Sequence, residues 1–469
     1  MSKLYERVAD EIADLVNKGV YNFGDRVPSV RSLSRELGVS TTTVVEAYRL
    51  LEDQGLLESR PQSGYYVTRH DPDSRTPNLQ CPKPASALPV TIGDLIIKVM
   101  NDNLCKDFVC LGGGDPDPEL VLTSRLQKCV SRAVSDKDGV ARYDLPPGCL
   151  ELRQVLAKMA VSAGCHFSPS DITLTNGCQE ALNLCLRAVC RYGDVVAIES
   201  PTFYGQLQAI EMLGLRVLEI PSDPTGGMSL DALRLALEEM PVKAVMVTPS
   251  HNNPTGSCMS EGNRRLLVET LNKAEVPLIE DDVYGDLGYG SKRIPAARSF
   301  DTSGMVLYCS SLSKTLAPGY RLGWTVAGRY QDEVQKLKTL TNLASPATLA
   351  LGAAYYLQGK TYERSLRPLR REYARRVRAM REEILTHFPV GTRVSDPRGG
   401  YVLWVELPPS IRTLELYKVA RQHGVIYAPG PLFSAGNRYG NCLRLCASVW
   451  GEAEAKAIRV LGQIFAENL

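Results

Sequence analysis

The chain has 469 residues, 44% of them hydrophobic, and a formal net charge of +2, which is ordinary for a globular protein of about three domains. No apolar run reaches the roughly 18 residues of a membrane-spanning helix, and residues 1–6 lack the apolar stretch of a secretory signal. The thirteen cysteines include no Cys-x-x-Cys pair and no cysteine–histidine set with zinc spacing. We therefore expect a cytoplasmic chain with reduced thiols, no metal and no membrane partner.

A proline-rich segment over 71–89 divides the chain. It holds five prolines, and proline at that density excludes both helix and central strand. The segment is therefore predicted to be an extended linker. It separates an N-terminal domain over 1–70 from a larger region over 90–469.

The N-terminal domain is predicted to contain three helices and a hairpin. Apolar residues at helical spacing, beginning at Tyr5, indicate an amphipathic first helix. The second helix opens at Ser29 and ends at Gly38, and the third covers 41–54. Two short runs of strand-forming residues follow, at 56–59 and 65–68, separated by turn residues.

Two helices joined by a glycine-containing turn and followed by a hairpin are typical of a winged helix-turn-helix. The stretch over 28–67 resembles the DNA-binding domain of the GntR family, which implies double-stranded DNA as a partner. That resemblance places the third helix in the major groove and the wing against the minor groove. The DNA contacts it implies are Arg31, Ser40, Thr41, Thr42, Thr43 and Gly64.

The N-terminal domain departs from the family pattern in its charge. Thr41 and Val45 stand where the family often has arginine, and residues 1–69 hold nine Lys and Arg against ten Asp and Glu. The basic surface expected of a DNA-binding domain is therefore local and weak. A winged-helix module used for protein contact is the alternative interpretation.

The larger region alternates short apolar runs with helical stretches. Such alternation predicts an α/β fold in which a mostly parallel sheet is covered on both faces. Helices are predicted over 179–191 and 230–239. Buried strands are predicted at 171–174, 195–198, 244–247, 276–279, 306–308 and 324–326.

Polar residues follow five of these runs, and open α/β sheets bind ligands at the carboxyl ends of their strands. Lys314, close to Ser311 and Ser313, is a residue type that forms a Schiff base when it is held neutral. Arg321 together with hydroxyl groups suits a phosphate dianion. Gly177 and Cys178 lie between a strand and a helix, so their amides are placed to bind the same phosphate.

Four further side chains suit an aromatic ring that carries a phenolate oxygen and a ring nitrogen. Phe203 offers a flat face for stacking, and Asp281 ends a buried strand where it can keep a pyridine nitrogen protonated. Tyr284 and Asn253 can donate hydrogen bonds to the phenolate oxygen. These groups together predict pyridoxal 5'-phosphate as the cofactor. Asp282 is the competing carboxylate.

From about residue 95 to the end, the motifs SLSKTLAPGYRLGW, HNNPTG, EDDVYGDL, SPTFYG and NCLRL resemble fold-type I aminotransferases. The resemblance implies a large subdomain over about 140–330, with a mostly parallel sheet, and a smaller α+β subdomain over about 331–469 plus the preceding segment. Lys314 would hold the cofactor covalently, Asp281 rather than Asp282 would contact the ring nitrogen, and Arg444 would bind a substrate carboxylate. Tyr143 would reach the phosphate of a neighbouring subunit, which implies a homodimer. The other expected cofactor contacts are Tyr284, Asn253, Phe203, Gly177, Cys178, Ser311, Ser313 and Arg321.

A winged helix, a linker and an aminotransferase-like domain in one chain resemble the MocR subfamily of GntR regulators. The resemblance implies a transcriptional regulator that binds pyridoxal phosphate on Lys314 and senses an amino compound, with a carboxylate, by aldimine exchange. A catalytically active aminotransferase with an auxiliary DNA-binding head is the alternative, because the residues for transamination are all present. A third interpretation makes the larger domain a dimerisation body only. The sequence leaves open whether the chain is an enzyme.

Overall fold

The computed structural model describes residues 4–17, 20–21, 25–53, 56–60, 64–67, 76–77, 87–91, 93–102, 107–121, 124–136, 141, 143–290, 292–358 and 361–469. The chain forms two compact units. The smaller is Met1–Thr76 with Gly288–Lys292, and the larger is Pro77–Leu287 with Arg293–Leu469. Each unit has its own apolar core, and each is described by itself below.

The described residues of the smaller unit form three helices and a two-stranded hairpin. An apolar cluster that includes Val8, Leu33, Val44 and Leu57 joins the helices to the hairpin. Gly38, in the turn between the second and third helices, has a φ of +63°, a left-handed conformation that costs glycine little. The elements are α1 (Leu4–Asn17), α2 (Val30–Glu36), α3 (Thr41–Asp53), β1 (Leu57–Arg60) and β2 (Gly64–Val67).

The segment predicted to be a linker ends earlier than expected. β3 (Leu88–Pro89) pairs antiparallel with β7 (Arg216–Asp223) at the edge of the large sheet. Pro89 is tolerated there because an edge strand leaves one row of backbone groups without a ladder partner. Most of 71–86 lies outside the described residues.

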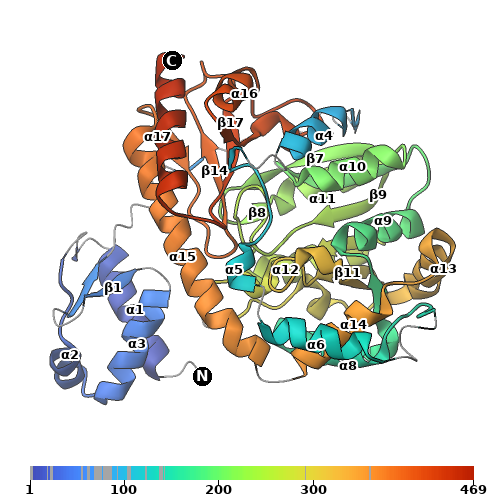
Figure 1. The fold of residues 1–469 in the computed structure, drawn as a ribbon, viewed down its shortest axis with the longest axis horizontal. Helices are drawn as coiled ribbons and strands as arrows, with labels where there is room; N and C mark the ends of the chain where they lie inside the picture. Colours follow the sequence, from blue (N-terminus) through green and yellow to red (C-terminus); the bar gives the residue numbers. More distant parts are fainter. Residues whose placement is uncertain are drawn as a thin grey trace. The chain divides into compact units, whose positions relative to one another are not determined.

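The large sheet lies at the centre of the larger unit (Figure 1). Its strand order is β3-β7-β6-β9-β10-β11-β12-β5, with β8 paired to β7. β7, β6, β9, β10 and β11 run parallel, whereas β11–β12 and β12–β5 pair antiparallel. The remaining strands are β5 (Thr173–Thr175), β6 (Val195–Ser200), β8 (Gly227–Met228), β9 (Val242–Val247), β10 (Leu278–Asp281), β11 (Val306–Ser311) and β12 (Gly323–Val326).

Helices cover the large sheet on both faces. Residues of α11 (Leu230–Glu239) and α12 (Glu261–Ala274) pack in one core cluster with the inner sides of β6, β7 and β9. α9 (Cys178–Val189) packs against β10, β11 and β12, where the Cys185 and Cys309 sulfurs lie 3.5 Å apart. The other helices of this part are α5 (Pro118–Val121), α6 (Ser124–Val134), α8 (Leu150–Ala160), α10 (Tyr204–Met212), α13 (Gln331–Asn342) and α14 (Ala347–Leu357).

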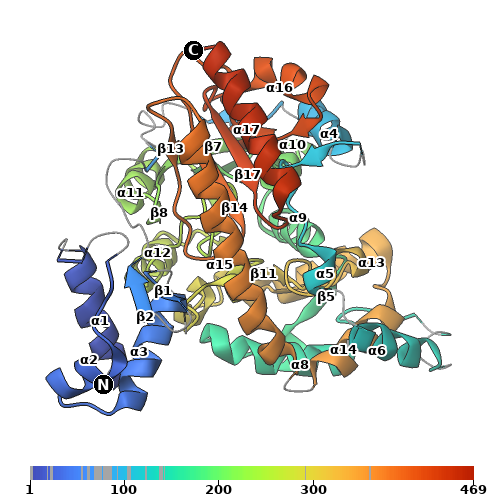
Figure 2. The ribbon, with the colours of Figure 1, turned by 60° about the vertical axis from the view of Figure 1, so that its left-hand side comes forward.

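A second, antiparallel sheet in the order β13-β14-β17-β16 follows in the C-terminal part. Its strands are β13 (Arg393–Val394), β14 (Val402–Glu406), β16 (Ala428–Pro429) and β17 (Cys442–Cys446). The long helix α15 (Thr361–His387) runs beside α17 (Glu452–Glu467) (Figure 2). β15 (Val425–Ile426) pairs with β4 (Val109–Cys110), so the segment that precedes the large sheet is attached here. α4 (Gly93–Asp102) and α16 (Thr413–Gln422) complete the unit.

Among the helices that the structure describes, none combines the length and apolar character needed to cross a membrane. The described residues also contain no group of three or more His, Cys, Asp or Glu side chains placed to hold a metal ion.

Candidate cofactor site and candidate DNA interface

Lys314 follows the carboxyl end of β11 and is enclosed by the larger unit. Its Nζ donates a hydrogen bond to the carbonyl oxygen of Gly114 at 2.6 Å and lies 5.6 Å from the centre of the Tyr284 ring. Burial lowers the pKa of Lys314, and the nearby carboxylate of Asp115 partly opposes that effect. A lysine whose neutral form is favoured can act as a nucleophile and as a base.

Asp281 is the last residue of β10, and its side chain points to the α9 face of the sheet. The thiol of Cys178 donates to its Oδ1 at 3.4 Å, and the amide of Val283 lies 3.3 Å away. Burial raises the pKa of Asp281 to about 6. The side chain of Gln206 also stabilises this carboxylate, which can accept a hydrogen bond from a protonated ring nitrogen.

The neighbouring Asp282 points the other way and is already satisfied. It accepts hydrogen bonds from Ser250 at 2.8 Å and Tyr308 at 2.7 Å, and it forms an ion pair with Arg293. Successive side chains of a strand alternate between faces, so only one of the two adjacent carboxylates can face α9. The arrangement favours Asp281 for the ring nitrogen.

Gly177 begins a turn in which an anion can be held. It precedes α9 with a φ of +85°, and a Cβ atom there would overlap the guanidinium of Arg321. Arg321 Nη2 donates to the carbonyl oxygen of Asn176 at 3.2 Å. The first amides of a helix have no partner within it, and the Arg321 guanidinium lies against Gly177, so this turn offers amides and a guanidinium to an anion.

Hydroxyl groups lie at the end of β11, where the same anion would be reached. Ser311 and Ser313 are buried, and the Ser313 amide donates to Ser311 Oγ at 3.3 Å. Ser313 therefore contributes its amide to this turn and holds the Ser311 hydroxyl in place.

Two residues that sequence reasoning missed hold the Gly177 turn from behind. The carboxylate of Glu180 accepts the Asn176 amide at 2.6 Å and the Lys338 ammonium at 2.7 Å. Lys338 is only 1% exposed. A charged pair this deeply buried fixes both partners, since separating them would leave a charge without compensation. In the sequence, only the position of Glu180 within α9 could have indicated this role.

Tyr284 and Asn253 flank the region between Lys314 and Asp281. The hydroxyl of Tyr284 is buried without a hydrogen-bond partner among the described residues, which is rare for a protein interior. Asn253 Oδ1 accepts from Arg444 Nη1 at 3.1 Å, which leaves its amide NH2 group for another acceptor. A phenolate oxygen would satisfy both donors. Phe203 is half-buried and caps α10, with its ring 4.6 Å from that of Tyr204.

Arg444 lies at the centre of β17 and is fully buried. Its Nη2 donates to the carbonyl oxygens of Gly112 and Gly113, the latter at 3.0 Å, and its Nε has no partner among the described residues. Gly112–Gly114 therefore supplies the acceptors for both Arg444 and Lys314. Sequence reasoning missed this loop, although three consecutive glycines after an apolar stretch marked it.

His251 and Tyr143 stand outside this group of residues. Burial lowers the pKa of His251 to about 3, and its ring packs against Gly399, so it is a neutral, structural side chain. Tyr143 is 79% exposed and forms no hydrogen bond with a described residue of its own chain. It is accessible to a second subunit.

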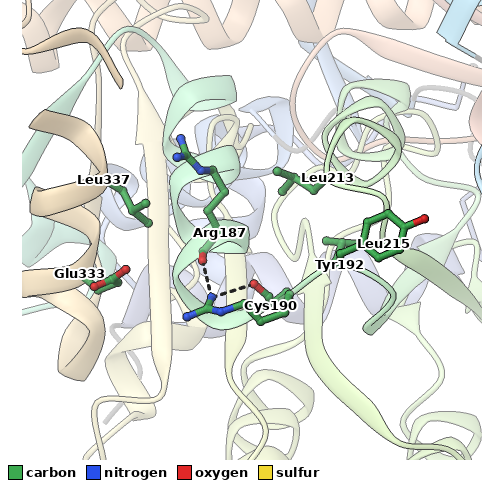
Figure 3. Close-up of a pocket in the computed structure, with 8 residues that line it drawn as sticks. Arg187, Cys190, Tyr192, Leu213, Leu215, Glu333 and Leu337 are labelled. Carbon is green, nitrogen blue, oxygen red and sulfur yellow. Dashed lines mark hydrogen bonds between the residues drawn. The ribbon is translucent and has the colours of Figure 1, made fainter. Parts of the chain in front are cut away.

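A separate cavity of about 280 Å³ lies at the far end of α9 (Figure 3). The Arg191 guanidinium donates to the carbonyl oxygens of Arg187 at 3.0 Å and Cys190 at 2.9 Å. Burial raises the pKa of Cys190 to about 12. Its thiol therefore favours the protonated form, which is a poor nucleophile.

The smaller unit presents the polar start of α3 to the surface. The Ser40 hydroxyl accepts the Thr43 amide at 3.1 Å and lies 2.8 Å from the Thr43 hydroxyl, so it caps the helix. Thr41 and Thr42 are exposed, as is Arg31 on α2. Capping uses the Ser40 oxygen locally and leaves Thr41 and Thr42 as the accessible hydroxyls.

The wing brings Gly64 together with an arginine that sequence reasoning did not name. Arg26 forms a β-bridge with Tyr66, and a Cβ atom on Gly64 would lie 3.1 Å from Arg26 Nε. Gly64 has a φ of +113°. The wing therefore carries a guanidinium beside its glycine, which adds positive charge to a domain with little of it. The wing residues 61–63 lie outside the described residues.

Known proteins match both units. The family of class I and II aminotransferases matches residues 103–459, and the gntR family of bacterial regulatory proteins matches residues 4–67. The chain is 36% identical, over 98% of both chains, to the uncharacterized HTH-type transcriptional regulator YjiR of Escherichia coli strain K12. It is 30% identical to the 2-aminoadipate transaminase of Thermus thermophilus, over 76% of this chain and 89% of that protein.

Solved structures match the larger unit. A multiple substrate aminotransferase from Thermococcus profundus superposes with a TM-score of 0.74 at 28% identity, over 80% of this chain and 94% of that one. The α-aminoadipate aminotransferase LysN of Thermus thermophilus, solved with N-(5'-phosphopyridoxyl)-L-leucine, gives a TM-score of 0.74 at 28% identity, over 79% and 94%.

An aminotransferase fold joined to a winged helix-turn-helix defines a class of regulators that pair a DNA-binding head with a cofactor-binding body. This chain belongs to the class I and II aminotransferase family and, with its gntR head, to the MocR subfamily of GntR transcriptional regulators. Its aminotransferase-like domain takes pyridoxal phosphate as cofactor. The Tyr284 hydroxyl, which has no partner among the described residues, and the Arg321 guanidinium beside the Gly177 turn fit that group.

Proposed function

We propose that the regulator holds pyridoxal phosphate covalently on Lys314 and senses an amino compound that carries a carboxylate. When bound, the cofactor supplies an aldehyde that can exchange its lysine partner for the amine of a ligand. The observation that carries the proposal is that Lys314 and Arg444 are hydrogen-bonded to the same loop, Gly112–Gly114. An α-amino acid presents an amine to the first residue and a carboxylate to the second.

The ligand competes with the loop at Arg444. A carboxylate on Arg444 replaces the carbonyl contacts of Gly112 and Gly113, because a charged fork-to-fork pair is stronger than a contact to a neutral carbonyl. Exchange with the ligand amine releases the Lys314 amine from the cofactor, and the released amine can donate to Gly114. The loop follows β4, which pairs with β15 in the C-terminal part. Ligand binding would therefore move a segment that connects the two parts of the domain, and that rearrangement is the proposed signal.

The remaining cofactor contacts follow from the side chains that surround Lys314. Asp281 would hold the ring nitrogen, while Tyr284 and Asn253 would donate to the ring oxygen and Phe203 would stack on the ring. The phosphate would be held by backbone amides, hydroxyls and one guanidinium, namely Gly177, Cys178, Ser311, Ser313 and Arg321. Glu180 and Lys338 would act as positioning residues for that turn.

We further propose that the protein acts as a cytoplasmic homodimer with Tyr143 reaching the phosphate site of the other subunit. The exposure of Tyr143 supports the second part. The cytoplasmic location is supported by the cysteines of the described residues, which form no disulfides and are mostly buried, as suits a reducing compartment. DNA would be contacted through Arg31, Thr41, Thr42, Thr43 and Gly64, with Ser40 capping α3.

Catalytic transamination is the second candidate function. The lowered pKa of Lys314 favours it, because a neutral lysine can accept a proton from the α-carbon of a bound amino acid. A sensor and an enzyme differ in turnover, since a sensor retains its ligand and an enzyme releases a keto acid.

One titration separates the two. The purified chain is titrated with a panel of amino acids, with and without a keto-acid acceptor, while the visible spectrum, keto-acid product and affinity for a selected DNA duplex are recorded. The sensor predicts a saturable spectral change that alters DNA affinity, with negligible product. Sustained keto-acid release without any change in DNA affinity would contradict it.

A further inference from the structure

Helix α15 carries the densest positive charge in the chain. Residues 361–381 contain eight arginines against two glutamates, whereas the whole chain has a net charge of only +2. Such a segment is usually a solvated helix face. The contacts of the individual arginines place seven of them in two groups, and the eighth, Arg381, is half-buried with an Nε that has no partner among the described residues.

The first group of arginines faces inward and holds the fold together. Arg370 Nε donates to the carbonyl oxygen of Asp286 at 2.6 Å. Arg376 forms ion pairs with Asp117 at 2.8 Å and Glu372 at 2.7 Å. These two side chains are satisfied within the larger unit, so their presence is explained by structure.

The second group faces outward and forms one stripe, which we call the α15 stripe. Its members recur at intervals of three and four residues, the spacing that places side chains on one helix face, and α15 lies on the near side of the body in Figure 2. Four are exposed and Arg378 is half-buried. Only Arg375 is ion-paired, with Glu372 at 2.7 Å; the others form no ion pair with a described residue. The stripe consists of Arg364, Arg367, Arg371, Arg375 and Arg378.

The α15 stripe destabilises the helix in the free protein and is complementary in charge to a polyanion. Like charges three and four residues apart on a helix repel one another. From Arg364 to Arg378 the stripe is about 21 Å long at the helical rise per residue. Duplex DNA carries one negative charge per roughly 1.7 Å of its axis, and guanidinium groups pair well with phosphate. The exposed Glu382 ends the stripe one turn later.

The DNA-binding head has little of the positive charge that would pair with DNA phosphates. Residues 1–69 hold nine Lys and Arg against ten Asp and Glu, although phosphate contacts supply much of the affinity of DNA-binding proteins. We propose that the α15 stripe of the aminotransferase-like domain binds the phosphate backbone of duplex DNA as a second, sequence-independent contact surface. The proposal rests on the DNA-binding function of the head and extends DNA contact to the body.

Salt dependence of DNA affinity tests the proposal in the full-length chain. The variant R364Q/R367Q/R371Q is compared with the matched variant K158Q/K336Q/K418Q, which removes the same charge from exposed positions on α8, α13 and α16. The probes are a mixed-sequence 40-base-pair duplex and a duplex selected from a random pool by the wild-type chain. Thermal unfolding and the cofactor spectrum of both variants serve as controls for folding.

The stripe variant is expected to reduce the steepness of log affinity against log salt concentration by about 2–3, since each lost phosphate contact removes about 0.9. Its preference for the selected duplex over the mixed one should persist, and the matched variant should behave as wild type. Equal slopes for the stripe variant and wild type would overturn the proposal. A wild-type chain that prefers no duplex, but still loses slope in the stripe variant, would contradict the role of the head and leave the stripe intact.

Discussion

The thiol of Cys178 donates a hydrogen bond to the carboxylate of Asp281 across 3.4 Å. The first residue of α9 thereby contacts the last residue of β10. Burial raises the pKa of Asp281 to about 6, and this hydrogen bond works in the opposite direction. Cys178, whose amide is proposed to bind the cofactor phosphate, therefore also stabilises the charged form of Asp281, which is proposed to bind the cofactor ring.

Cys178→Ala tests that link. Loss of the thiol donor should destabilise the ionised form of the Asp281 carboxylate. We expect affinity for pyridoxal phosphate to fall by about 3- to 10-fold, which corresponds to the loss of one modest hydrogen bond. Cys178→Ser should retain most of the affinity. Cys185→Ala, a buried cysteine of the same helix that contacts Cys309 and Thr325, is the control. Fluorescence titration of the cofactor-free chain gives the constants, and equal affinities for the two Cys178 variants would refute the link.

Asp281 should also make the stability of the cofactor-free chain depend on pH. Its pKa rises from an ordinary 3.8 to about 6 in the folded chain, so the folded state holds a proton that the unfolded state releases earlier. Stability therefore falls as pH rises from about 4 to 6. Asp281→Asn should remove this loss and stabilise the cofactor-free chain at pH 7 by on the order of 1–3 kcal/mol, with no gain at pH 4. Denaturant unfolding at both pH values measures it, and an equal effect at the two would be inconsistent with the assignment.

Gly177→Ala should disrupt the phosphate turn. A Cβ atom would overlap the Arg321 guanidinium at a φ of +85°, so we expect at least a tenfold loss of cofactor affinity. Gly193 provides a matched control, because it has a φ of +86° and nothing within 4 Å of its Cβ position. Gly193→Ala should cost about 1 kcal/mol of stability through backbone strain alone and leave cofactor affinity unchanged. Similar cofactor affinities for the two variants would place the phosphate elsewhere.

Arg444→Lys separates ligand recognition from cofactor binding. Lysine keeps the positive charge but loses the planar fork that pairs with a carboxylate. We expect cofactor affinity within about threefold of wild type and amino-acid affinity reduced by more than tenfold. The spectral titration reports both. Unchanged amino-acid affinity would mean that the carboxylate binds at another residue.

Two substitutions in the head are expected to have opposite effects on its stability and on its DNA affinity. Ser40→Ala removes the cap of α3 and should destabilise the head by about 1 kcal/mol with a small effect on DNA affinity. Arg31→Ala should leave stability unchanged and weaken DNA binding several-fold. Calorimetry and DNA titration are needed on both variants. Loss of DNA affinity in Ser40→Ala alone would exchange the two roles.

Most of the fold followed from local patterns in the sequence. The predicted helix over 230–239 coincides with α11, and each predicted strand of the large sheet is present within a few residues. β7 was not predicted because Glu219 and Pro221 interrupt its apolar run. Glu219 is tolerated in a buried strand because the backbone amide of Ala435, from the C-terminal part, donates to it. That partner is 216 residues away, and no local pattern contains it.

The candidate site divides along the same line. Lys314 was predicted from its residue type and its neighbours, and Arg444 from the family resemblance, whereas the acceptors they contact were not predicted. The pairing of β4 with β15 brings Gly112–Gly114 to these two side chains. Because that pairing forms only in the folded chain, no local sequence pattern reveals it. The choice between Asp281 and Asp282 could be predicted from the sequence, because the alternation of side chains along β10 places only one of them on the α9 face.

Reduction of the purified protein with borohydride, followed by digestion and mass spectrometry, tests the central claim most directly. The reaction fixes the cofactor to the amine that holds it. The account predicts a single phosphopyridoxyl group on the peptide that contains Lys314, and its loss when reduction follows saturation with a sensed amino acid. A cofactor fixed to another lysine, or attachment to Lys314 that no amino acid displaces, would contradict it.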